Sequence, residues 1–260
     1  MTKKLKNNIR KGLTLFLLLG ILFYSCKKEE TVNVLKTYFP KDKQIVFSEY
    51  IIKNGDTIMD GKYTVCKYNG KKIKSGRYKN GKSIGPLIFY YDNGKIESID
   101  NRYNNKFREV IFNYRNGEVE RYELYDDYGN LNFIINFNEQ GNVENYKGYP
   151  VMEIYQYKIA NKEQFKTNIN QYLKVGDILK YQYLVANIPN AKRNFNIELV
   201  GSDNATIKRT ITKKPPVRID AEEILTKKGI NKIKAVVEYK FNDNKKTVIK
   251  DSIFFEVKVN

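Results

Sequence analysis

The segment Ser75–Ser98 reads SGRYKNGKSIGPLIFYYDNGKIES and determines how the first half of the chain folds. Two turn signals, Asn80-Gly81 and Asn93-Gly94, stand on either side of the apolar run LIFYY. Asn and Gly tolerate the positive φ that a tight hairpin turn needs, whereas aromatic and β-branched residues favour strands. The segment therefore predicts antiparallel strands joined by two-residue Asn-Gly turns.

The same turn recurs on both sides of this segment, every 11 to 13 residues. The predicted turn positions are Gly70, Gly81, Gly94, Asn105, Gly117, Gly129 and Gly141. Alternate turns are 23 or 24 residues apart, so the repeating unit is a pair of strands. Between the turns lie runs such as REVIFNY and LNFIINF, which suit strands. We therefore expect a meander of antiparallel hairpins over residues 55–149.

One copy of this unit resembles the MORN-type repeat of the YwqK-like antitoxin family. The matching residues are Gly76, Tyr78, Gly81, Gly85, Phe89, Tyr90 and Gly94. A later copy, FREVIFNYRNGEVE, keeps Phe112, Tyr114 and Gly117 but lacks the inner glycine pair. The resemblance covers about residues 55–148 and implies a β-hairpin repeat. It also implies an alternative function, in which an immunity-type protein neutralises a toxin.

The aromatic residues of the repeat alternate with polar ones and allow two interpretations. They can pack one face of the sheet, so that each hairpin buries the next. Alternatively, tyrosines form an exposed row that binds a protein or a glycan, because Tyr offers amphipathic contact area at little entropic cost. The candidate binding residues are Tyr78, Tyr91, Tyr103, Tyr114 and Tyr122.

Residues 150–260 lack the glycine repeat but contain seven short segments that mostly alternate apolar and polar residues. Seven strands over about 110 residues are typical of an immunoglobulin-like β-sandwich. We expect this domain to have its own core and to unfold independently of the repeat. Residues 161–173 are ambiguous and could form a short helix. The predicted fold class is thus all-β, a hairpin meander followed by a sandwich.

The N-terminus has the pattern of an export signal. Five basic residues precede Leu13–Ser25, a run of thirteen mostly apolar residues that is too short to span a membrane. The run ends in LFYSC, which resembles the lipobox of bacterial lipoproteins. The resemblance implies cleavage after residue 25 and attachment of palmitate-type acyl chains to Cys26, which anchor a protein stably when more than one is present. An uncleaved N-terminal anchor is the alternative.

The residues that follow predict where the anchored protein is sent. Lys27, Lys28, Glu29 and Glu30 resemble the export signal of Bacteroidota lipoproteins that reach the outer face of the outer membrane. The alternative is that these four residues begin a solvated tether. We predict an outer-membrane, cell-surface lipoprotein with a signal peptide (1–25), a tether with the first strands (26–54), the repeat domain (55–149) and the sandwich domain (150–260).

Composition argues for binding rather than catalysis. The formal net charge is +18, and removal of the five basic residues before Cys26 leaves +13. Export argues against nucleic acid, so an anionic glycan or an acidic protein is the expected partner, together with the lipid bilayer. The absence of histidine excludes Ser-His and Cys-His pairs, and we expect no catalytic residue, metal or cofactor.

Aspartate and cysteine side chains can form metal sites or reactive sites, but we predict structural roles for both residue types in this chain. The carboxylates Asp56, Asp60, Asp126 and Asp127 are predicted to be turn residues. Cys66 is predicted to be a buried or half-buried strand thiol, with a reactive or intermolecular thiol as the alternative.

Overall fold

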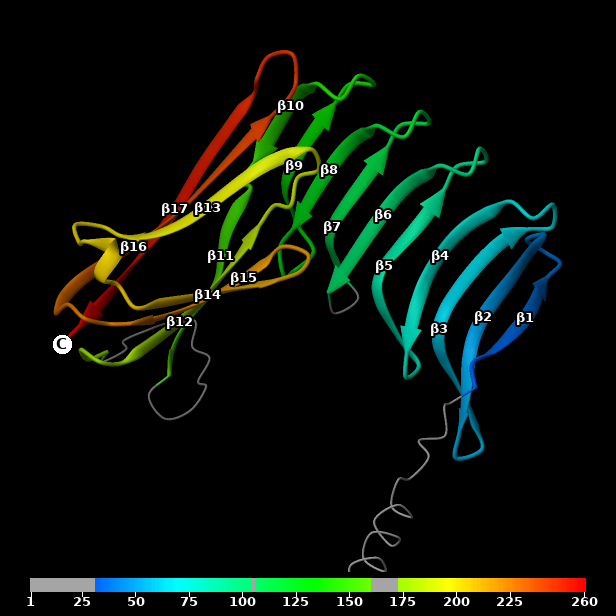
Figure 1. Ribbon diagram of the computed structural model, residues 1–260, viewed down its shortest axis with the longest axis horizontal. Coiled ribbons are helices and arrows are strands. Elements are labelled where there is room, and N and C mark those ends of the chain that lie inside the picture. Colours follow the sequence, from blue (N-terminus) through cyan, green and yellow to red (C-terminus); the bar gives the residue numbers. More distant parts are fainter. Residues whose placement is uncertain (1–30, 104–105, 160–172) are drawn as a thin grey trace, which may run out of the picture.

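The computed structural model describes residues 31–103, 106–159 and 173–260. In this part of the chain the regular structure consists of antiparallel strands and one short 3-10 helix, Asn204–Thr206. Figure 1 shows a long row of strands at one side and a two-sheet body at the other. The predicted all-β class, with a hairpin meander followed by a sandwich, is confirmed.

The first ten strands form one sheet in which each strand pairs with the next along the sequence. They are β1 (Asn33–Phe39), β2 (Gln44–Lys53), β3 (Asp56–Lys67), β4 (Lys72–Lys79), β5 (Lys82–Tyr90), β6 (Ile96–Tyr103), β7 (Lys106–Asn113), β8 (Val119–Tyr125), β9 (Leu131–Phe137) and β10 (Val143–Gly148). The sheet thus continues without a break through the expected boundary at residue 54.

The described glycine turns that the sequence predicts are of two kinds, and only one had been expected. Asn80-Gly81 is a two-residue turn with φ of 48° and 74°, as predicted. At Gly94, by contrast, the glycine N–H donates to the carbonyl of Tyr91 and the Tyr91 N–H donates to the carbonyl of Lys95. This is a three-residue loop in which only the glycine takes positive φ, 84°.

The loops at Gly70, Gly117, Gly129 and Gly141 repeat the backbone hydrogen bonds of the Gly94 loop, and each of these glycines has positive φ. The prediction of two-residue turns is therefore wrong for these positions. Its requirement for glycine is right, because the last loop residue must be left-handed. Asn105 lies outside the described residues.

Burial changes sharply along the meander. Of residues 33–90, all of which the structure describes, only Ile51 and Val65 are buried. Figure 1 shows β1–β5 as a single layer with no other described element against it. At the other end, β8 and β9 bury Tyr122, Leu124 and Phe133 completely. The first half of the meander is therefore a single-layer sheet, and the second half belongs to a core.

Contacts between neighbouring strands stabilise the single layer in place of a core. The rings of Tyr63 in β3 and Tyr78 in β4 lie 5.1 Å apart. The Lys72 ammonium lies 4.7 Å from the centre of the Tyr90 ring. Gly76 faces Tyr63 so closely that a Cβ there would lie 2.5 Å from the ring. Such cross-strand pairs contribute roughly 0.2–1 kcal/mol each.

The remaining seven strands form the sandwich. One sheet has the order β11-β12-β15-β14 and the other the order β13-β16-β17. Their bounds are β11 (Val151–Ile159), β12 (Ile178–Val185), β13 (Ala191–Leu199), β14 (Arg209–Lys214), β15 (Arg218–Ile224), β16 (Gly229–Phe241) and β17 (Val248–Val259). With the strands lettered A to G this order is ABED and CFG, the arrangement of constant-type immunoglobulin domains.

Aromatic rings join the two sheets across the interior of the sandwich. The Tyr181 ring in β12 lies 5.3 Å from that of Phe255 in β17, and the Tyr183 ring lies 5.8 Å from that of Phe195 in β13. The buried ion pair Arg209–Glu223 adds a hydrogen bond from Arg209 to the carbonyl of Ile197 in the opposite sheet.

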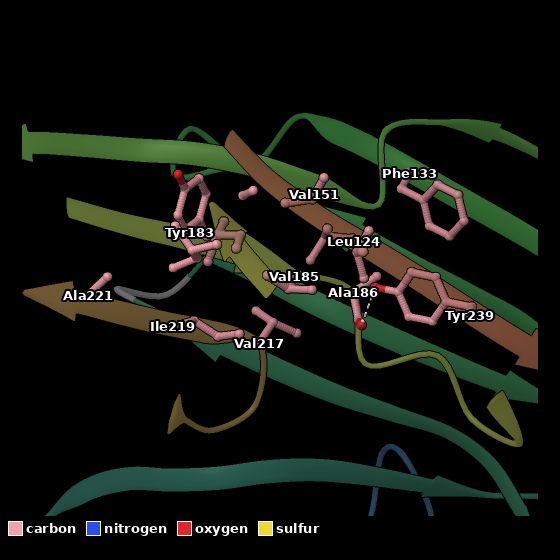
Figure 2. Packing of buried hydrophobic residues seen from close by; sticks show 14 of the residues in the cluster. Leu124, Phe133, Val151, Tyr183, Val185, Ala186, Val217, Ile219, Ala221 and Tyr239 are labelled. Carbon is pink, nitrogen blue, oxygen red and sulfur yellow. Dashed lines mark hydrogen bonds between the residues drawn. The ribbon is translucent and has the colours of Figure 1, made fainter. Parts of the chain in front are cut away.

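The sandwich does not have a separate core, so the expectation of one is wrong, and the reason for expecting independent unfolding is removed. One cluster of buried side chains runs from β8 and β9 into the sandwich, as Figure 2 shows from Leu124 and Phe133 to Val185 and Tyr239. The Phe137 ring also lies 5.9 Å from that of Phe241 in β16. The meander lacks a second layer of its own, so its last strands bury their apolar face against the sandwich. We call the region where β6–β10 meet the sandwich the joint.

Candidate functional site

The predicted lipidation site and export signal lie outside the described residues. Cys26 and Lys27 to Glu30 precede Thr31, the first of them. Cys26 precedes Asn33, where β1 begins, by seven residues.

Two of the candidate tyrosines hold one loop of the meander to the next. The Tyr91 hydroxyl donates to the carbonyl of Asn113 at 2.5 Å, and the Tyr114 hydroxyl donates to the carbonyl of Phe137 at 2.8 Å. Asn side chains make the same link, as Asn116 donates to the carbonyl of Glu139 at 3.0 Å. These contacts span 22 or 23 residues, one repeat, so the repeated Tyr and Asn have a structural role.

The five candidate tyrosines do not form one exposed row. Tyr122 is fully buried, so its assignment to a binding face is wrong. Tyr78 packs on Tyr63 in the single layer, and the side chain of Tyr103 is outside the described part. The period of the sequence places equivalent residues in equivalent strands or loops, but it does not show which ones the sandwich covers.

The structural roles predicted for the aspartates and for Cys66 agree with the structure at some positions and not at others. Asp126 accepts hydrogen bonds from the backbone of its own loop, as expected of a turn residue. Asp60, however, lies inside β3, where it accepts from Lys79 and from the backbone of Asn80. Cys66 is a half-buried free thiol in β3, as predicted.

A buried polar network lies inside the joint. The Glu109 carboxylate accepts hydrogen bonds from the Tyr122 hydroxyl at 3.0 Å and from the Asn101 amide at 2.9 Å. The Tyr122 oxygen in turn accepts from the backbone N–H of Asn187 in the sandwich at 2.9 Å. Burial raises the pKa of Glu109 to about 7, although these hydrogen bonds and Arg193 oppose the shift. The network therefore ties the sandwich to β6–β8 through an ionisable group.

A cavity of about 260 Å³ opens at the joint. Its walls are Arg102 of β6, Arg108 of β7 and Asp127 of the β8–β9 loop on one side, and Ile154, Gln182, Leu184, Lys214, Pro215, Pro216, Val217 and Arg218 of the sandwich on the other. In Figure 1 the β14–β15 hairpin extends from the sandwich toward the meander at this place. We call it the joint cavity.

Two carboxylates hold three of the cations of the joint cavity, Arg108, Lys214 and Arg218. Buried Arg108 pairs with Asp127 and lies 3.5 Å from the carbonyl of Tyr125. Arg218 contacts both carboxylate oxygens of Asp220, at 2.7 and 3.2 Å, and Lys214 reaches the same group at 2.6 Å. Burial raises the pKa of Asp220, but these hydrogen bonds outweigh it and hold the pKa below its usual value.

The sequence alone does not reveal this cavity. Its four cationic residues come from four strands or strand ends that are up to 116 positions apart, and the chain has 47 Lys and Arg residues in all. Asp127 was assigned to a turn, where it does lie. Its partner Arg108 stands at an irregularity in the register of β6 and β7, which the sequence does not show. No short motif encodes such a meeting of distant strands.

No protein-family model matches the chain, and no curated protein matches it. Within the described residues, no helix combines the length and the apolar character needed to cross a membrane.

Proposed function

We propose that this chain is a lipid-anchored, non-catalytic binding protein in which the meander holds the sandwich away from the membrane. The observation that supports this most directly is the consecutive strand order. It puts β1, close in sequence to Cys26, at one end of the sheet and the joint at the other. Ten strands leave nine spacings of about 4.8 Å, which gives roughly 43 Å between β1 and β10, the far strand of the joint, measured along the sheet.

The anchor in this proposal is acylated Cys26 in the outer membrane, and Lys27 to Glu30 direct the protein to the cell surface. This part rests on the sequence. If Cys26 carries the lipid, Cys26→Ser abolishes labelling of the protein by an alkyne fatty acid in cells. Equal labelling of the wild type and the mutant would contradict the anchor.

Surface display has a separate test. Replacement of Lys27 to Glu30 by alanine leaves lipidation intact and protects the protein from protease added to intact cells, whereas the wild type is cut. If the wild type resists protease in intact cells but not in broken cells, the protein faces the periplasm.

The spacer role is tested by energy transfer to acceptor lipids in vesicles that carry the lipidated protein. One fluorophore is placed in β1 through Thr37→Cys and another in the β16–β17 loop through Lys245→Cys, both exposed sites, in a Cys66→Ser background. We expect strong transfer from position 37 and weak transfer from position 245, because transfer falls steeply with distance. Equal transfer from the two sites would mean that the sheet lies along the membrane.

A further inference from the structure

We propose that the joint cavity binds a sugar-sized molecule bearing a carboxylate or a phosphate. The proposal goes beyond anchoring and display and does not depend on them. It rests on three observations: the charged residues of the cavity, its size together with its apolar walls, and the exposure of two of its cations.

The charge of the walls favours an anion. Arg102, Arg108, Lys214 and Arg218 line the cavity, and Asp127 is the one carboxylate among its lining residues, all of which the structure describes. Together with Asp220, which contacts Lys214 and Arg218, these residues comprise four cations and two carboxylates. Arginine is well suited to such a ligand because its planar donors match a carboxylate or a phosphate in a bidentate manner.

The size and the remaining walls limit the ligand to a small organic molecule. Pockets for drug-sized ligands begin at about 300 Å³, so 260 Å³ holds one small molecule or a single unit of a longer one. Ile154, Leu184 and Val217 offer apolar surface, and Gln182 adds an amide that can donate and accept. A ligand with a charged group and a carbon skeleton satisfies both kinds of wall, and an inorganic ion satisfies only one.

The position of the cations also distinguishes a binding site from a purely structural joint. Arg108 is almost fully buried and pairs with Asp127, which suffices for a structural contact. The Lys214 side chain is half exposed, and that of Arg218 is 30% exposed. These side chains stand at an open edge of the cavity, where a ligand can reach them from solvent.

The test is calorimetric titration of the full-length protein in detergent with four probes: glucuronate, glucose 6-phosphate, glucose and inorganic phosphate. We expect at least one charged sugar to bind at millimolar concentration or below, with glucose and inorganic phosphate binding much more weakly. The comparison of glucuronate with glucose 6-phosphate identifies which acidic group the cavity prefers. Equal binding of glucose, or no binding of either charged sugar, would overturn the proposal.

A matched pair of variants locates the site. Lys214→Gln removes a charge from the cavity and weakens binding of the charged sugar about tenfold or more, the effect of losing one charge-assisted hydrogen bond. Lys213→Gln removes the same charge from the neighbouring exposed residue, which does not line the cavity, and leaves binding unchanged. Equal weakening by both would show non-specific attraction and contradict the site. Arg102→Gln, on the opposite wall, decides the question if Lys214→Gln fails to fold.

Discussion

Among single residues, Glu109 gives the joint a pH dependence. Burial raises its pKa from 4.5 to about 7, so between these values the folded protein binds a proton that the unfolded chain has released. This contribution to stability is fully present below about pH 4.5 and is lost as the pH rises through about 7. The full shift corresponds to roughly 3 kcal/mol.

We therefore expect the free energy of unfolding, measured with denaturant, to fall by up to roughly 3 kcal/mol between about pH 5 and about pH 8. Glu109→Gln keeps the side-chain shape and should flatten this dependence, whereas Glu97→Gln, at an exposed site, should leave it in place. A Glu109→Gln profile as steep as the wild type would show that another group is responsible.

Gly94 tests the loop geometry at the same scale. A Cβ at this position would meet nothing within 4 Å, so a substitution acts through the backbone, whose φ is 84°. Gly94→Val should lower stability by about 1–3 kcal/mol. Gly94→Asn should cost less, because Asn tolerates the left-handed region. Thermal unfolding measures both, and identical losses would mean that backbone strain is not the cause.

At the scale of the element, the Tyr and Asn links join the β5–β6, β7–β8 and β9–β10 loops along one edge of the meander. The repeat spaces its loops so that a loop can contact the next loop on the same edge, which lies one pair of strands further along the chain. The last of these loops contacts the sandwich. There the Asn142 side chain accepts from the backbone of Asn244, and the Asp243 carboxylate accepts from the backbone of Val143 at 3.4 Å. The contacts along this edge are therefore continuous from the meander into the β16–β17 loop.

Removal of one hydroxyl from this edge should cost stability without affecting the joint cavity. Tyr114→Phe deletes the hydrogen bond to the carbonyl of Phe137, and we expect a loss of about 0.5–1.5 kcal/mol in denaturant unfolding. Tyr128→Phe is the control, because Tyr128 is 79% exposed. A similar change in both variants would argue against the structural role of Tyr114.

At the scale of the whole molecule, the shared core predicts that the end of the meander and the sandwich unfold together. Phe241 in β16 is buried against Phe137 in β9, and Phe241→Ala removes a large side chain from that contact. We expect a loss of about 3–5 kcal/mol and faster hydrogen exchange in β9 as well as in β16.

Phe254→Ala in β17 provides the comparison, because Phe254 is 53% exposed and should have a small effect. Faster exchange confined to the sandwich in Phe241→Ala would mean that the joint does not couple the two parts. The strands β1–β5, which share little of this core, should exchange at similar rates in both variants.

The sequence by itself determined the local features. Glycines at a period of 11 to 13 residues placed the turns, since a left-handed loop position strongly favours glycine. Alternation of apolar and polar residues predicted seven strands in residues 150–260, the number found among the residues that the structure describes there, since side chains alternate between the faces of a sheet. The turn residues could not distinguish two-residue from three-residue loops, because Asn-Gly suits both.

Only the tertiary structure decided which faces are covered. The tyrosines of the repeat look alike in sequence, yet Tyr122 lies in a core and Tyr78 in a single layer, because the sandwich packs on the last strands of the meander alone. The joint cavity likewise needs Arg102 and Arg218 to meet from positions 116 residues apart. Local periodicity reports the conformation of a strand, whereas burial and charge clusters depend on which distant strands come together.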